Sequence, residues 1–508
     1  MKIIAKIVCL LSIFFLSINS NAQGVNKRYP FVNTIFSAGL NAFENDSGYL
    51  MIGGVDSGIA SIGIVQTDFE GNVLFQKTIM DTNLAYFAGF QGSLIKVSSG
   101  GYAMYGSVAT SSWARDKLYR FNSVGDTLWT KTMGDTAFDQ VGSQVKETLD
   151  GGFVCVGQNT QYSGQNWVVK TDSLGAIEWE QWYGSGVERP TAIALTPDSG
   201  YIFTGWTRSL GPGAPNNDNI RITKIDKQGN LQWNRVFGQT DDDNAWSINT
   251  TQDGGYIFGG SIRTVNTDSR TKHYAIRLDS QGDTIWTRAY NPPTLANSGL
   301  NGFRTIIELS DGNFIAAGQE VYTDSISFSR HDGLIMKLKP NGDILWNKTY
   351  RILGMNANGT DFEIKDIRPT NDGGFICGGV VYPSFPDTGT QDMWLMKIDS
   401  NGCVDTSNCV IVSSIESHTQ LEEEQYTLKA YPNPFVYQLT IVVVLPQEST
   451  NAYLVIKDVA GKELCRTKLN SATNQYNIEG KQFSSGIYFY FIEDKEKIIL
   501  PQKLIKME

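Results

Sequence analysis

Gln-Asp-Gly-Gly-Tyr at residues 252–256 and Asp-Ser-Gln-Gly-Asp-Thr-Ile-Trp at residues 279–286 form one copy of a pattern that is repeated along this chain of 508 residues. The opening step ends in an aromatic residue and occurs seven times, at intervals of 48 to 61 residues, at Tyr49, Tyr102, Phe153, Tyr201, Tyr256, Phe314 and Phe375. Repetition at this period, with strand-like segments and glycine-rich turns, is typical of a β-propeller. We therefore expect an all-β fold, with a seven-bladed β-propeller over residues 23–410.

Each repeat reads as four short strands. In the fifth repeat we expect strands at 245–250, 256–262, 273–278 and 284–290, with a polar loop at 263–272. The two tight turns are explained locally, because Asp bonds the backbone two residues on and Gly takes the positive φ of a hairpin turn. Calcium ligation by the turn aspartates is the alternative, but the alternating oxygen ligands of an EF-hand loop are missing.

Two further positions recur in every repeat or nearly so. A large aromatic residue on the fourth strand suits packing between blades better than a ligand cage, and it occurs at Phe75, Trp129, Trp179, Trp233, Trp286 and Trp346. A basic residue before the second turn indicates either a structural pairing or a solvated face, and it occurs at Lys170, Lys224, Arg277, Lys337 and Lys397.

The seventh repeat breaks the pattern, because Thr406 stands where the fourth-strand aromatic should be. Residues 28–34, before the first repeat, have no blade of their own. Pairing this segment with the last blade would close the ring and remove an exposed edge. Cys403 and Cys409 then predict a disulfide at the seam, whereas Cys155 and Cys377 read as small buried side chains.

Targeting and charge limit the partners. Lys2 and Lys6, an apolar run at 7–18 and small residues near 20–22 indicate a signal peptide over residues 1–22, and no later segment predicts a transmembrane helix. The formal charge is −10, although residues 429–508 contain ten basic and eight acidic residues. The acidic propeller disfavours nucleic acid and leaves cations, neutral glycans and basic proteins as partners.

After a linker at 411–428, residues 429–508 predict a small, immunoglobulin-like β-sandwich with strands at 439–445, 452–458, 486–492 and 498–507. Its ordered motifs contain Tyr431, Pro432, Asn433, Pro434, Gly461, Gly486, Tyr488, Lys503 and Lys506. This set resembles the type A C-terminal sorting domain of the type IX secretion system of Bacteroidetes. The resemblance implies a cargo protein that passes through the periplasm, contacts the secretion machinery and crosses the outer membrane. It is then released or attached to the cell surface.

No catalytic motif is present, and His273 and His331 read as ordinary surface histidines. An acidic residue precedes several first strands, at Asp139, Glu188, Asp243 and Asp361, with Asn301 in the same place in the sixth repeat. These residues would lie on the face that also collects the loops of variable length, where binding is common. There they would either cap backbone N–H groups or bind a ligand, and several carboxylates would suit a cation such as Ca²⁺.

Three functions follow as hypotheses. The first is a binding module for an extracellular glycan or protein. The second is an extracellular hydrolase or lyase that uses paired carboxylates as acid and base. The third is a structural component of the surface layer. The sequence contains no cofactor motif for any of them.

Overall fold

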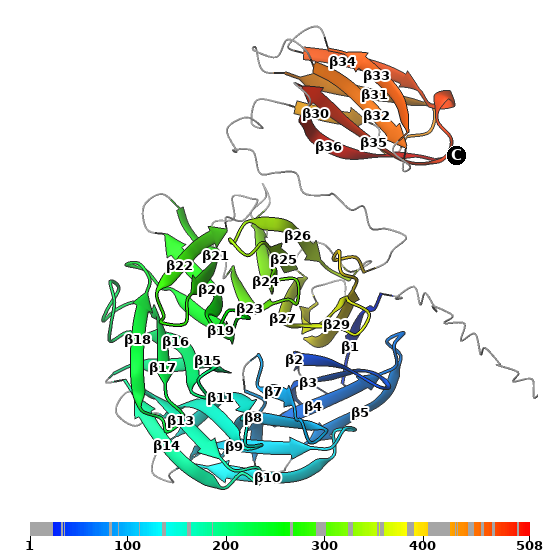
Figure 1. Ribbon diagram of the computed structural model, residues 1–508. Coiled ribbons are helices and arrows are strands. Elements are labelled where there is room, and N and C mark those ends of the chain that lie inside the picture. Colours follow the sequence, from blue (N-terminus) through cyan, green and yellow to red (C-terminus); the bar gives the residue numbers. More distant parts are fainter. Residues whose placement is uncertain are drawn as a thin grey trace, which may run out of the picture. The chain divides into compact units, whose positions relative to one another are not determined.

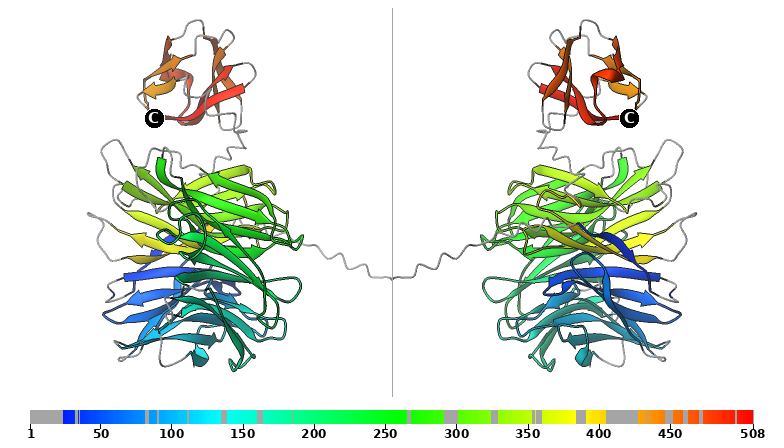
Figure 2. Two further views of the ribbon diagram at one scale, coloured as in Figure 1. Left: turned by 90° about the vertical axis from the view of Figure 1, so that its left-hand side faces the viewer. Right: turned by 90° about the vertical axis from the view of Figure 1, so that its right-hand side faces the viewer.

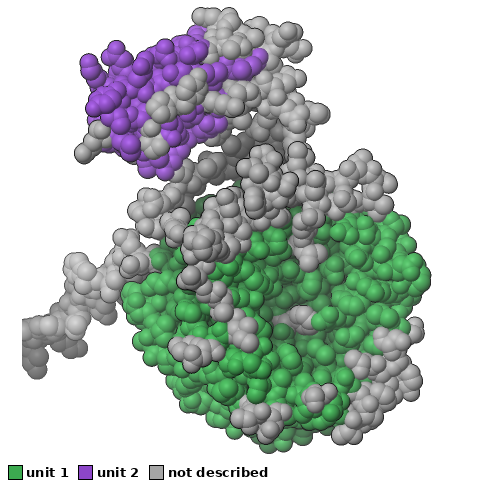
Figure 3. Space-filling view, turned by 180° about the vertical axis from the view of Figure 1, so that it is seen from behind, with its two compact units in different colours: residues 1–411 green, residues 412–508 purple. Residues whose placement is uncertain are grey.

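The computed structural model describes residues 24–507 except 32–33, 35, 81–83, 90, 111, 135–138, 160–163, 185, 265–267, 291–300, 324–328, 353–354, 356–359, 384–390, 405–426, 432, 434, 446–451, 459–461, 470–472 and 495–496. The signal peptide expected at 1–22 therefore lies outside the described residues. The chain divides into two compact units, Met1–Ile411 and Val412–Glu508 (Figure 3). No helix among the described residues is long and apolar enough to cross a membrane.

The first unit is the expected seven-bladed propeller, with seven antiparallel sheets arranged around a centre (Figure 1, Figure 2). Blade 1 contains β2 (Phe36–Asn45), β3 (Gly48–Asp56), β4 (Ala60–Thr67) and β5 (Val73–Ile79). Blade 2 contains β6 (Ala85–Phe87), β7 (Leu94–Lys96), β8 (Tyr102–Ala109), β9 (Ala114–Phe121) and β10 (Thr127–Met133). Its innermost strand is split, because β6 and β7 both pair with β8.

The next four blades each have four strands in sequence order. Blade 3 contains β11 (Gln140–Glu147), β12 (Phe153–Asn159), β13 (Gln165–Thr171) and β14 (Ile177–Tyr183). Blade 4 contains β15 (Glu188–Leu195), β16 (Tyr201–Thr207), β17 (Asn219–Ile225) and β18 (Leu231–Phe237). Blade 5 contains β19 (Asn244–Thr250), β20 (Tyr256–Thr264), β21 (Asp268–Leu278) and β22 (Thr284–Tyr290). Blade 6 contains β23 (Gly302–Glu308), β24 (Phe314–Thr323), β25 (Ser329–Leu338) and β26 (Ile344–Tyr350).

Blade 7 is built from both ends of the unit. Its strands β27 (Asp361–Pro369), β28 (Phe375–Tyr382) and β29 (Asp392–Ile398) are completed by β1 (Asn26–Tyr29), which pairs antiparallel with β29. The Trp394 indole donates to Asn26 Oδ1 over 2.8 Å, and the backbone N–H of Lys397 donates to Val25 O over 2.7 Å. The expected closure by the N-terminal segment is thus confirmed, and it explains why the seventh repeat has no fourth-strand aromatic.

Adjacent blades are joined by aromatic packing, as expected. The fourth-strand Trp of one blade meets the opening aromatic of the next edge to face, with ring centroids 6.2 Å apart for Trp233 and Tyr256 and 6.1 Å apart for Trp286 and Phe314. Four residues after this position, a Tyr hydroxyl donates to a glycine carbonyl in the next blade, as in Tyr290 to Gly342 over 2.7 Å. Tyr29 of β1 makes the same bond to Gly71 over 2.8 Å, so β1 acts as a true fourth strand.

The second unit is a β-sandwich. One sheet contains β30 (Thr427–Tyr431), β31 (Gln438–Val444) and β34 (Thr473–Glu479), and the other contains β32 (Ala452–Asp458), β33 (Glu463–Lys468), β35 (Gly486–Asp494) and β36 (Lys497–Lys506). A short 3₁₀ helix, η3 (Gly480–Gln482), precedes β35. Apolar side chains from both sheets, including Leu439, Ile441, Leu454, Tyr490 and Leu504, form its core.

Candidate functional site

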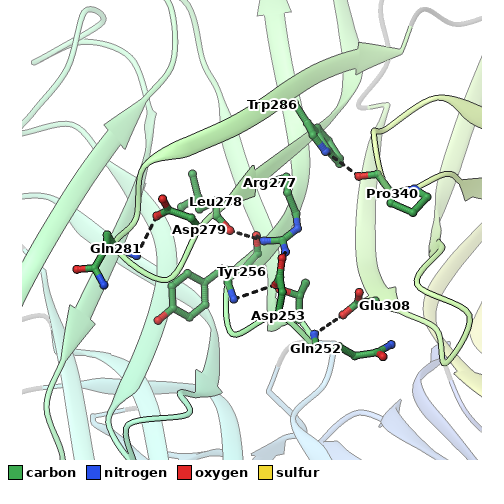
Figure 4. A network of polar contacts seen from close by, with 12 residues as sticks. Gln252, Asp253, Tyr256, Arg277, Leu278, Asp279, Gln281, Trp286, Glu308 and Pro340 are labelled. Atoms are coloured by element: carbon green, nitrogen blue, oxygen red, sulfur yellow. Dashed lines mark hydrogen bonds and ion pairs between the residues drawn. The ribbon is translucent and has the colours of Figure 1, made fainter.

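The turn aspartates and the recurring basic residues form one structural module (Figure 4). Asp253 Oδ1 accepts the Gly255 N–H over 3.1 Å and the Thr251 hydroxyl over 2.7 Å, while the Arg277 guanidinium forms an ion pair with Asp253 over 2.5 Å. Equivalent ion pairs join Lys170 to Asp150, Lys224 to Asp198, Lys337 to Asp311 and Lys397 to Asp372. Of the two alternatives for the basic residues, the structural pairing is confirmed, and these carboxylates hold the turns in place.

The acidic residues before the first strands lie in four different blades. The Asp139 carboxylate accepts the Ala114 N–H over 2.7 Å, and Asp361 accepts the His331 N–H over 2.9 Å. Asp243 accepts two backbone N–H groups, from Gln239 over 2.6 Å and from Arg263 over 2.9 Å. Burial raises the pKa of Asp243 to about 6. These bonds support the capping role, and the ligand-binding role of the four residues stays a prediction.

Glu188 is the fourth of these residues and is fully buried. It accepts the Thr207 hydroxyl over 2.9 Å and forms an ion pair with Arg221 over 3.1 Å. Burial raises its pKa, although Arg221 and Thr207 lower it. Asn301 has the same place in blade 6 and accepts the Val321 N–H over 2.8 Å.

The expectation of a surface position is wrong for His273, whose ring is fully buried between blades 5 and 6. Its Nε2 lies 2.8 Å from Gln319 O, and burial lowers its pKa to about 4. The ring packs on Phe303, with centroids 5.0 Å apart. Strand β21 begins five residues earlier than expected, so His273 lies inside a strand instead of at its exposed start. His331 is partly buried.

Sequence reasoning missed a central pocket of about 300 Å³. Its walls come from the inner strands β2, β11, β19, β23 and β27 and from residues 91–96, so six blades contribute. Its lining includes Glu44, Lys96, Asn249 and Asn371, which lie where the inner strands run into their turns. Asp139, Glu188, Asp243 and Asp361 stand at the opposite ends of inner strands. We call this cavity the central pocket.

Charged side chains in and beside the central pocket are mostly paired. Arg304 donates to Glu363 over 2.5 Å, and Arg368 donates to Asp366 over 2.7 Å. Burial raises the pKa of Glu363, but Arg304 and Lys365 outweigh it and hold that pKa at about 2. The charged lining was not recognised in the sequence, because equivalent positions carry opposite charges in different repeats, as with Glu44 and Lys96, which pair with Tyr49 and Tyr102.

In the second unit, Asn433 of the Tyr-Pro-Asn-Pro motif ties the start of the domain to its last strand. Its side-chain amide donates to Lys503 O over 2.8 Å, and its Oδ1 accepts the Ile505 N–H over 2.9 Å. The Tyr488 hydroxyl donates to Ser484 O over 2.7 Å, and Lys506 lies over the Phe435 ring. Gly486 opens β35. Pro432, Pro434 and Gly461 lie outside the described residues, as does the side chain of Tyr431.

The sequence of this unit matches a known family. Residues 429–507 match the secretion system C-terminal sorting domain. The chain is a cargo protein of the type IX secretion system. As such, this cargo protein is exported to the cell surface or secreted, and its sorting domain interacts with the secretion machinery.

Solved structures similar to this cargo protein include a fungal alcohol oxidase of the AA5 family in complex with copper, which is 12% identical, with 95% of this chain and 100% of that chain covered and a TM-score of 0.42. PorZ, a surface component of the type IX secretion system of Porphyromonas gingivalis, is 12% identical, with coverages of 92% and 81% and a TM-score of 0.25. The WD40 domain of SCAP from fission yeast is 10% identical, with coverages of 83% and 96% and a TM-score of 0.34. At these TM-scores the likenesses give no information on activity. No curated protein matches the cargo protein.

Proposed function

We propose that this exported protein is a binding module for an extracellular glycan or protein, and that the central pocket is its binding site. The proposal rests on one observation: a cavity of about 300 Å³ at the middle of the propeller, lined by polar and charged side chains from six blades. Concave sites with a few convergent polar groups are where ligands are usually held. Because the surrounding blades are rigid, those groups would lose little conformational entropy when a ligand binds.

The hydrolase or lyase hypothesis finds less support in this cavity. Its two lining carboxylates are both engaged, Asp366 by Arg368 and Glu44 by the Asn371 N–H over 2.6 Å. An acid–base pair needs two carboxyl groups that are free to exchange protons with a substrate. The structural hypothesis for the surface layer requires no ligand and is separated from ours by a binding experiment.

The test uses a substitution that narrows the mouth of the central pocket and leaves its charged residues unchanged. Asn371 is exposed in the turn after β27, and only its backbone N–H is used by Glu44. We expect Asn371→Trp to abolish binding on an array of immobilised glycans and extracellular proteins, with an unchanged melting temperature. Leu149 has the same place in the turn of blade 3 but does not line the pocket, so Leu149→Trp is the matched control. Equal binding by both variants, or no binding by the wild type, would refute the proposal.

A further inference from the structure

Lys146 of β11 stands out among the lining residues of the central pocket. Its side chain is half-buried, and no described residue forms a hydrogen bond or an ion pair with its Nζ. Burial and the neighbouring Arg368 lower the pKa of this amine to about 8, although Asp366 opposes the shift. A partly desolvated cation without a counter-ion is unfavourable unless something else supplies the negative charge.

The surroundings of Lys146 are rich in positive charge. The cations that line the pocket are Lys96, Lys146, Arg304 and Arg368, whereas the carboxylates that line it are Glu44 and Asp366. Lys365 and Arg304 share the single carboxylate of Glu363. This local excess is opposite in sign to the charge of the whole chain, which is −10. An excess of positive charge favours an anionic ligand over a neutral or cationic one.

Neutral hydrogen-bonding groups accompany the cations. The Gln91 side chain is 95% buried, lines the pocket, and its Nε2 has no hydrogen-bond partner in the described structure. The amides of Gln144 and Asn249 also line the cavity, but their nitrogens already donate to Gln91 O over 3.0 Å and to Ile306 O over 2.8 Å. Unpaired buried donors are costly, and a ligand with several hydroxyl groups would satisfy them.

We propose that the central pocket binds a sugar acid, such as a uronic acid residue of a glycan, with its carboxylate on Lys146 and a hydroxyl group on the Gln91 amide. This inference rests on the proposed function and names the ligand class. A volume of about 300 Å³ is at the lower end for ligand pockets and suits a single sugar ring. The charge-assisted bond between an amine and a carboxylate is stronger than a neutral one and would restore the proton affinity of Lys146.

The experiment measures the affinity of the purified full-length protein for D-glucuronate and D-galacturonate by calorimetry, with glucose and galactose as neutral counterparts. We expect the acids to bind at least tenfold more tightly than the neutral sugars. Lys146→Met should lose this preference, whereas Lys146→Arg should keep it, because the charge remains. Lys131 is exposed on the outer strand β10, so Lys131→Met is the matched control and should bind like the wild type.

The pH dependence of the affinity distinguishes a Lys146 that contacts the ligand from one that only stabilises the fold. Affinity for the acids should fall as the pH rises above about 8 in the wild type, because Lys146 loses its proton, and should stay constant in Lys146→Arg. The other charged side chains that line the central pocket with Lys146 are those of Lys96, Arg304, Arg368, Glu44 and Asp366.

The outcomes separate the two proposals. Equal affinity for acidic and neutral sugars, or an undiminished preference in Lys146→Met, overturns the sugar-acid inference. Tighter binding of a peptide with a free carboxylate than of either sugar acid also overturns it. If neutral glycans bind the wild type and Asn371→Trp abolishes this binding, the proposed function stands while the inference fails. If neither acidic nor neutral ligands bind, both fail.

Discussion

At the scale of single residues, side chains that recur from repeat to repeat have the same contacts in their blades. Residues that occur in one repeat alone have contacts that the repeat pattern does not predict. Asp253 and its counterparts, each paired with a Lys or Arg, were predictable because the pattern recurs at one position. His273 and Lys146 occur once, so no periodicity indicated their burial or their surroundings. His273 lies beside Glu320, and Lys146 has no hydrogen-bond or ion-pair partner among the residues that the structure describes. Both environments depend on side chains from neighbouring blades, which come together only when the ring closes.

Asp243 permits a prediction about pH. Burial raises its pKa to about 6, so the folded protein holds this proton more tightly than the unfolded chain does. The stabilisation is therefore present below pH 4 and is lost as the pH rises through 6. We expect the free energy of unfolding of the wild type to fall by roughly 2–3 kcal/mol relative to Asp243→Asn between pH 4 and pH 8. Urea unfolding of both proteins measures this, and parallel pH profiles would contradict it.

Tyr29 tests the closing contact. Tyr29→Phe removes the hydroxyl that donates to Gly71, and a lost hydrogen bond of this kind costs about 1 kcal/mol. Tyr290→Phe removes the equivalent bond to Gly342 and is the matched control. Both variants should lose similar stability, but only Tyr29→Phe should speed hydrogen exchange in β29. Unchanged exchange in β29 would show that the hydroxyl does not hold the closing strand.

At the scale of elements, strands with an alternating or apolar pattern were predictable and polar edge strands were not. The expected strands at 284–290 and 452–458 coincide with β22 and β32. Strands β33 and β34 were missed, because Glu463–Lys468 is largely exposed and polar and Thr473–Glu479 is rich in polar residues. The division of the first strand of blade 2 into β6 and β7 was also missed, since both pieces have only three residues.

Strand β36 is an edge strand that carries Lys503 and Lys506 and is tied to Asn433. Deleting the chain from Ile498 removes it, and we expect the protein to accumulate in the periplasm with a folded propeller, since each unit has its own core. Asn433→Ala should reduce export less severely, because it breaks only two hydrogen bonds. Fractionation and immunoblotting measure both effects. Normal delivery of the truncated chain would show that the last strand is not needed for sorting.

At the scale of the whole molecule, the covalent state of the seam is open to test. Cys403 is buried in the last turn of blade 7, and Cys409 lies outside the described residues, so their disulfide stays a prediction. An exported protein permits the bond, and closing so short a loop would contribute roughly 2 kcal/mol. Non-reducing peptide mass spectrometry should find the linked pair, with Cys155 and Cys377 as free thiols. Two free thiols at 403 and 409 would rule the bond out.

The pairing of β1 with β29 also determines when the propeller can close during synthesis. Asn26 and Trp394, which meet across the β1–β29 pair, are 368 positions apart in the chain. Strand β1 therefore has no β29 to pair with until nearly the entire propeller has been synthesised. A product that stops before β29 cannot seal the ring and keeps open strand edges, which invite aggregation and proteolysis. The ring therefore closes only when the chain is present from β1 through β29.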